Sequence, residues 1–317
     1  SRSNKDDNFM KKRYAFLFPG QGSQYVGMGQ DLYMEYPEVR ELFDFANERL
    51  GFSLTSIMFE GPEDLLMETV HSQLAIYLHS MAVVKVLSQR SSIQPSLVSG
   101  LSLGEYTALV ASDRISVLDG LELVRKRGQL MNEACNQSPG AMAALLGLPS
   151  EVIEENITSL GQGIWIANYN APKQLVVAGI AEKVDQAIEL FRDLGCKKAV
   201  RLKVSGAFHT PLMQVAQDGL APDIYALCMK DSSLPLVSHV VGKSLVNTEE
   251  MRECLARQMT SPTLWYQSCY HIESEVDEFL ELGPGKVLAG LNRSIGISKP
   301  ITSLGTFAQI EKFLSEV

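Results

Sequence analysis

The sequence has few of the residues on which disulfide scaffolds and zinc proteins depend. Its five cysteines are an odd number, lie far apart and include no C-x-x-C pair. This pattern argues against a disulfide framework and against a zinc site. We therefore expect reduced thiols, no bound metal and a cytoplasmic location.

The sequence also lacks the features of membrane proteins and of general nucleic-acid binders. It has no run of about 18 apolar residues, so we expect no transmembrane helix. With 28 basic and 37 acidic residues the net charge is −9, whereas nucleic-acid binding requires a basic footprint. Residues 1–9 are polar and have no apolar core, which is typical of a cloning remnant or a disordered leader and not of a secretory signal.

The composition that remains is that of an ordinary globular protein. Of 317 residues, 45% are hydrophobic and 21% are charged. This length suits two domains, or one large domain that carries an insertion. Short apolar runs at residues 14–18, 96–100 and 279–282 end in glycine-rich turns and alternate with helical patterns, so we expect an α/β fold.

Residues 139–206 have a pattern of their own. Their expected order of elements is βαββαβ, which is the ferredoxin-like arrangement. The expected strands and helices of this unit are strands 141–148, 164–169, 174–178 and 198–204 and helices 150–160 and 182–194. We therefore predict a small inserted subdomain at 139–206, and a large subdomain made of residues 10–138 and 207–317.

The strongest chemical signal is the sequence from Gly100 to Gly104, which fits the pattern G-x-S-x-G. In this nucleophile elbow a serine lies on a tight turn between a strand and a helix, and the small residues let neighbouring segments pass. The helix N-terminus then favours negative charge near the serine oxygen. The pattern alone is common, and the alternative is a structural turn serine. The expected strand before Ser102 and helix after it favour a nucleophile.

A serine nucleophile needs a base, and five histidines are available: His71, His79, His209, His239 and His271. His209 follows a predicted strand in a loop, where catalytic groups often stand, but this favours it only modestly. In α/β-hydrolases the histidine comes late, after an acid. About a hundred residues follow His209, and no acid between it and Ser102 stands out, so a plain esterase fits imperfectly.

Several long motifs in one order are more specific than the elbow alone. On these motifs the chain resembles the malonyl-coenzyme A:acyl carrier protein transacylases over residues 14–313. This resemblance implies a hydrolase-like parallel-sheet core with a ferredoxin-like insertion. The motifs are Phe18-Pro19-Gly20-Gln21-Gly22-Ser23-Gln24, Ser102-Leu103-Gly104-Glu105-Tyr106, Gly140-Ala141-Met142-Ala143-Ala144, Gly206-Ala207-Phe208-His209-Thr210-Pro211-Leu212-Met213 and Glu281-Leu282-Gly283-Pro284-Gly285-Lys286-Val287-Leu288.

The resemblance implies a role for each residue of the reaction centre. Ser102 would form a malonyl ester, and His209 would take its proton and later activate the carrier thiol. Gln258 matches the position whose carbonyl holds the histidine, in place of the usual carboxylate. Gln21 and Leu103 match the residues whose backbone amides form the oxyanion hole.

Arg127 matches the arginine that binds the malonyl carboxylate in this family. A guanidinium can hold a carboxylate through two parallel hydrogen bonds, which a lysine cannot. For its neighbours Arg125 and Lys126 we expect a solvated helix face. Gln73 and Asn168 also match positions that line the pocket. Phe208, just before the histidine, resembles the malonyl-selective pattern, although one methyl group is worth only about 1–3 kcal/mol in a pocket.

Two residues depart from the family pattern. Leu101 stands where histidine is usual, and Leu74 follows Gln73 where proline is common. Leu101 lies beside the nucleophile and removes no catalytic group. A leucine there resembles some free-standing acyltransferases of polyketide synthases. The sequence therefore leaves two pathways for the acceptor, fatty-acid synthesis and polyketide synthesis.

The expected function is malonyl transfer from malonyl-coenzyme A to acyl carrier protein by a ping-pong route. The alternatives are a serine hydrolase or thioesterase and a non-catalytic scaffold; the intact serine, histidine and glutamine argue against a scaffold. We expect no cofactor, no nucleic-acid or membrane partner, and a monomer. Because the carrier should be acidic, a local basic surface is required. The candidate residues are Lys197, Lys198, Arg201 and Lys203.

Overall fold

A computed structural model describes residues 11–317 of the chain. The expected leader at residues 1–9 lies outside this range. The larger of two sheets has the order β10-β9-β1-β2-β7-β8. Its strands are parallel except for β8, which pairs antiparallel with β7 at the edge. The strands are β1 (Tyr14–Phe18), β2 (Pro95–Gly100), β7 (Leu236–Ser238), β8 (Lys243–Leu245), β9 (Glu278–Leu282) and β10 (Ile301–Leu304).

Strand β1 shows why this sheet is covered on both faces. All five of its residues are buried, as in a central parallel strand. Successive side chains alternate between faces, so Phe16 and Phe18 belong to one apolar core and Ala15 and Leu17 to another. The apolar run read from the sequence is therefore a strand between two helical layers.

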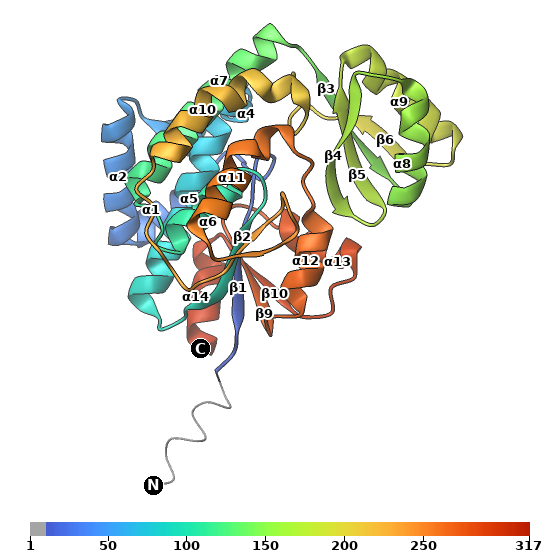
Figure 1. The fold of residues 1–317 in the computed structure, drawn as a ribbon. Coiled ribbons are helices and arrows are strands. Elements are labelled where there is room, and N and C mark those ends of the chain that lie inside the picture. Colours follow the sequence, from blue (N-terminus) through green and yellow to red (C-terminus); the bar gives the residue numbers. More distant parts are fainter. Residues whose placement is uncertain (1–10) are drawn as a thin grey trace.

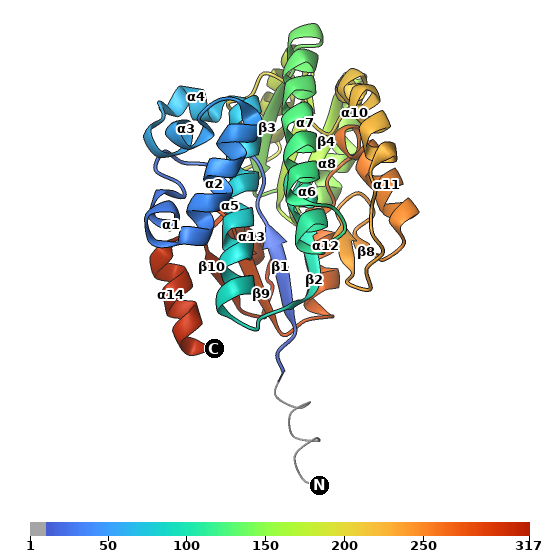
Figure 2. The ribbon, with the colours of Figure 1, turned by 90° about the vertical axis from the view of Figure 1, so that its left-hand side faces the viewer.

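Helices form a layer on each side of the sheet. Figure 2 shows α5, α6 and α7 on the viewer's side of the sheet, with β1 visible between α5 and α6, while Figure 1 places α12 and α13 on the other side. The helices of the large subdomain are α1 (Gln30–Glu35), α2 (Pro37–Leu50), α3 (Leu54–Glu60), α4 (Glu63–Met67), α5 (Thr69–Arg90), α6 (Gly104–Ala111), α7 (Val117–Gln137), α10 (Gln214–Ala226), α11 (Thr248–Arg257), α12 (Trp265–Glu273), α13 (Val287–Ile295) and α14 (Phe307–Glu316).

The second sheet is small, antiparallel and ordered β4-β5-β3-β6. One face is covered by two helices, and the other adds Met142, Ala167 and Val176 to the large core. Figure 1 shows this unit beside the main sheet. The observed order confirms the predicted βαββαβ pattern, and the bounds 139–206 stay a prediction. Its elements are β3 (Ala141–Leu146), α8 (Ser150–Ile157), β4 (Ile164–Ala171), β5 (Gln174–Gly179), α9 (Ala181–Asp193) and β6 (Lys198–Arg201).

Local patterns missed some elements. The helical pattern near residues 62–70 is divided between two helices, because Glu68 has the extended ψ of 134° and separates α4 from α5. The elements α12, α13, β10 and α14 were not predicted. The three helices pack against the sheet through buried apolar side chains, and β10 is an edge strand of that sheet. No helix among residues 11–317 is long and apolar enough to cross a membrane.

Candidate active site

Ser102 lies at the turn between β2 and α6, where the chain reverses sharply. Its φ is 54°, in the left-handed region that non-glycine residues rarely adopt. A Cβ on Gly100 would lie 1.9 Å from the carbonyl carbon of Gly104, and one on Gly104 would lie 2.2 Å from the Phe18 oxygen. The two glycines are thus required by close backbone contact, which is the steric basis of the elbow.

The Ser102 hydroxyl meets the ring of His209. Its Oγ lies 2.9 Å from His209 Nε2, and the His209 Nδ1–H donates to the backbone oxygen of Gln258 at 3.1 Å. Because Nδ1 carries the proton, Nε2 is free to accept the hydrogen of the serine hydroxyl. Burial, and then the charge of Arg127, lower the pKa of His209 to about 4. The imidazole is therefore neutral near pH 7 and available as a base.

Arg127, on α7, points its guanidinium at the same oxygen. Its Nη2 donates to Ser102 Oγ at 3.1 Å and to Gln258 Oε1 at 3.0 Å, and its Nη1 donates to Gln73 Oε1 at 2.8 Å. The residue is only 1% exposed, and burial lowers its pKa. No carboxylate lies within hydrogen-bonding distance of it among residues 11–317. A buried cation beside the Ser102 hydroxyl, held only by neutral partners, is suited to receive an anionic group.

The loop after β1 lies against the elbow. A Cβ on Gly20 would be 2.4 Å from the oxygen of Leu101, and the Leu101 amide donates to Phe18. Within the described part of the chain, the amides of Gln21 and Leu103 donate no hydrogen bond to another residue. Both N–H groups therefore have no protein partner, as the donors of an oxyanion hole require.

The other expected residues are less closely tied to this centre. Phe208 is buried in the large core directly before His209, and Asn168 lies on β4, paired with Val176. No hydrogen bond joins Asn168 to Ser102, His209 or Arg127. The two departures are packing residues: Leu74 is buried, and Leu101 packs against the apolar core beneath α12 and α13.

A groove of about 420 Å³ leads from the surface to His209. One wall comes from β4, with the apolar side chains of Trp165 and Ile166, and the other includes Pro211 and Pro262. Such a groove can hold a thin, mostly apolar chain that ends beside His209. No group of three or more potential metal ligands was found among residues 11–317.

Two buried residues of this site were not predicted as functional. His239, directly after β7, accepts a hydrogen bond from the Ser102 amide, and Glu105 bonds to Gln258. A signal was present in the sequence: His239 lies at the end of a short apolar stretch at 234–240, and carboxyl ends of neighbouring parallel strands meet at one edge.

Comparisons with known proteins agree with this geometry. The family model of the acyl transferase domain matches residues 15–306. The malonyl CoA-acyl carrier protein transacylase of Bacillus subtilis is 41% identical over 287 residues, covering 89% of this chain and 90% of the relative.

Solved structures give the same result. The chain superposes on the Streptococcus pneumoniae MCAT with a TM-score of 0.88 and 39% identity, covering 96% and 100% of the two chains. For a malonyl-transacylase solved with its type II PKS acyl-carrier protein, the TM-score is 0.92 and the sequence identity is 34%. The match covers 96% of this chain and 100% of that one. The chain therefore belongs to the acyl transferase family, as one of its malonyl CoA-acyl carrier protein transacylases.

Proposed function

We propose that this acyltransferase moves the malonyl group of malonyl-coenzyme A to the phosphopantetheine thiol of an acyl carrier protein, through a malonyl ester on Ser102. The observation that carries the proposal is the buried guanidinium of Arg127, 3.1 Å from the Ser102 hydroxyl. A malonyl carboxylate bound there places its thioester carbon, two bonds away, beside the nucleophile.

The first half-reaction forms the ester. Ser102 Oγ attacks the thioester carbon while its proton passes to His209 Nε2. The free amides of Gln21 and Leu103 stabilise the oxyanion. His209 then gives the proton to the departing sulfur of coenzyme A, so that each bond made is matched by one broken.

The second half-reaction reverses these steps with another thiol. The carrier thiol enters by the groove along β4, and His209 Nε2 takes its proton. The thiolate attacks the ester carbon, and Ser102 leaves with the proton that His209 held. No cofactor is required, because this chain supplies nucleophile, base and oxyanion donors.

Intact-protein mass spectrometry tests both halves. Mixing with malonyl-coenzyme A should add one malonyl group, and phosphopantetheinylated carrier protein should then remove it. Ser102→Ala should abolish the adduct; an adduct that persists on this variant would show that the nucleophile is wrong. Decay to free malonate without transfer would favour a hydrolase.

The carrier is expected to dock near the basic side chains of the small subdomain. Lys197, Lys198, Arg201 and Lys203 are all exposed on or beside the edge strand β6, and only Arg201 has an ion-pair partner, Asp185. Free cations on an enzyme of net charge −9 offer a local attraction for an acidic partner.

Charge reversal tests this surface. Lys197→Glu with Lys198→Glu should raise the apparent Michaelis constant for the carrier and leave the rate of malonyl-enzyme formation unchanged. Equal losses in the two half-reactions would overturn the docking site.

For the enzyme itself we propose a monomer. We also propose a cytoplasmic location, which is consistent with its five free cysteines.

A further inference from the structure

The backbone of Ser102 is held on both of its polar groups. The amide donates to His239 Nε2 at 3.0 Å, and the carbonyl oxygen accepts from Gln258 Nε2 at 2.9 Å. A left-handed conformation such as φ 54° persists at a non-glycine residue only where the surroundings fix it. The two bonds are therefore part of what keeps the elbow in place.

The first bond defines the protonation of His239. An imidazole nitrogen accepts a hydrogen bond only when it carries no proton, so the single proton of this ring lies on Nδ1. Among the described residues, Nδ1 has no partner. With the proton on Nε2, however, both the Ser102 amide and Nδ1 would lack a hydrogen-bond partner. Fewer unsatisfied buried groups favour the proton on Nδ1.

Glu105 connects the two residues that hold the Ser102 peptide. Its Oε2 accepts from the His239 amide at 3.3 Å, and its Oε1 accepts from Gln258 Nε2 at 2.6 Å. Oε1 is also 3.3 Å from His239 Nε2. A charged carboxylate would repel the lone pair there, so a neutral carboxyl suits an accepting Nε2.

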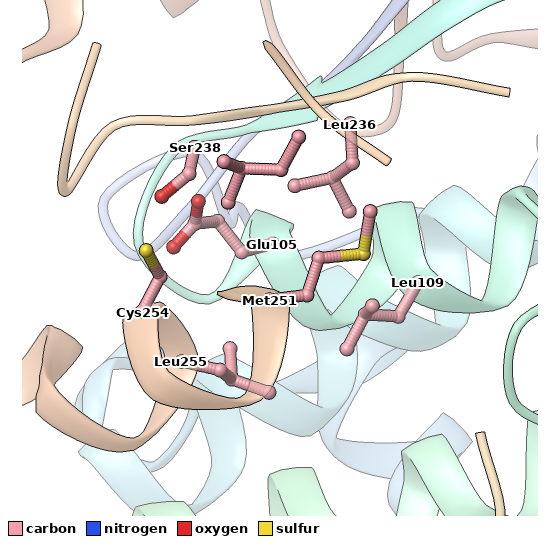
Figure 3. A pocket seen from close by; sticks show the side chains of 8 residues that line it. Glu105, Leu109, Leu236, Ser238, Met251, Cys254 and Leu255 are labelled. Carbon is pink, nitrogen blue, oxygen red and sulfur yellow. The ribbon is translucent and has the colours of Figure 1, made fainter. Parts of the chain in front are cut away.

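The surroundings of Glu105 favour its neutral form. Figure 3 shows the carboxyl beside Ser238, with apolar side chains such as Leu109 and Met251 around it. The cavity that they line is about 10 Å³, the lower limit for one water molecule. Burial raises the pKa of Glu105 to about 7.

We propose that His239 is a positioning residue for the nucleophile. Its unprotonated Nε2 accepts the hydrogen bond of the Ser102 amide, and Glu105 holds the backbone amide of His239. By fixing the Ser102 peptide, His239 sets the position of Ser102 Oγ and of the next amide, that of Leu103. The ring also lies 6.0 Å from the ring of His209, edge to face, so a neutral His239 does not oppose the positive charge that His209 gains during transfer. This inference rests on the proposed role of Ser102.

A pair of variants separates the acceptor from the shape of the side chain. His239→Leu removes the acceptor, whereas His239→Gln places an amide oxygen near the position of Nε2. We expect the rate of malonyl-enzyme formation to fall about tenfold to a hundredfold in the leucine variant, with unchanged affinity for malonyl-coenzyme A. The glutamine variant should recover most of that loss. His271→Gln, on α12 and bonded to Ser244, is the control and should match the unaltered enzyme.

Two outcomes would overturn the role of His239: a leucine variant as fast as the unaltered enzyme, or a glutamine variant as slow as the leucine one. Nitrogen-15 NMR of labelled histidine uses the unaltered protein, so this test can be made even if the His239 variants do not fold. We expect Nδ1 of His239 to be protonated and Nε2 to be bare at neutral pH. A proton on Nε2 would contradict the proposal. Because the bond uses the Ser102 backbone, this result is independent of the Ser102→Ala labelling that tests the nucleophile.

Discussion

Ser102 Oγ and His209 Nε2 lie 2.9 Å apart, and both residues have left-handed backbones, with φ of 54° and 61°. Such conformations cost about 1–3 kcal/mol at non-glycine residues and are concentrated at functional sites. The hydroxyl and the imidazole are thus in hydrogen-bonding contact before any substrate binds. The strain is stored in two turns that the surrounding sheet holds in place.

The pH dependence of ester formation should reveal His209. Its pKa is lowered to about 4, and the base must be unprotonated to act. Protonation of His209 therefore removes activity on the acid side, and below the pKa of Glu105 we expect a constant rate between about pH 6 and about pH 5, halved near pH 4. Rapid-quench measurement of the malonyl-enzyme, with circular dichroism to check folding, gives the profile. A midpoint at the ordinary histidine value of about 6.5 would contradict this assignment.

Arg127→Ala should remove the preference for a carboxylate. Because a buried charged contact is lost, kcat/KM for malonyl-coenzyme A should fall about a hundredfold or more. Transfer of acetyl groups or hydrolysis should be retained or gained. The control is Lys126→Ala, one residue away, whose ammonium contacts Asp223 outside the site. Unchanged malonyl preference in the Arg127 variant would remove this residue from the pocket.

Gly104→Ala tests the steric requirement of the elbow. The new Cβ would lie 2.2 Å from the Phe18 oxygen, so strand and helix must separate. We expect a loss of at least about 3 kcal/mol in the free energy of unfolding, and loss of covalent labelling. Gly290→Ala in α13 is the matched control, because its Cβ would meet only Arg293 Nη2, at 3.8 Å. Denaturant titration should show the control slightly stabilised, by about 0.5–1 kcal/mol.

Glu105→Gln should alter how stability depends on pH. The pKa of Glu105 is raised from 4.5 to about 7 in the folded protein, so its neutral form is favoured by folding. That stabilisation is complete below the unfolded value and is lost as pH rises through about 7. Relative to the unaltered protein, the variant should therefore gain up to about 3 kcal/mol between about pH 5 and about pH 8.

The control for this measurement is Glu273→Gln, at an exposed hydrogen bond to Ser298. The pKa of Glu273 is lowered, so its contribution should stay constant over the same range of pH. A pH-independent difference between the unaltered protein and the Glu105 variant would show that this carboxyl is not held neutral by burial.

Much of the fold could be predicted from local patterns. The apolar run at 14–18, the elbow at Gly100–Gly104 and the βαββαβ order of the small subdomain each depend on neighbours within a few residues. The helices near the C-terminus were missed. Their apolar faces are short and become clear only against the sheet that they cover.

The sequence by itself determined the elbow, because the steric need for glycine on either side of Ser102 is local. The resemblance of several motifs to the transacylase family also implied roles for Arg127 and His209. Only the tertiary structure showed which histidines contact Ser102. Ser102 and His239 are 137 residues apart, and they meet because β2 and β7 are neighbours whose carboxyl ends share one edge of the sheet. Long-range pairing of this kind depends on how strands assemble, which no local pattern specifies.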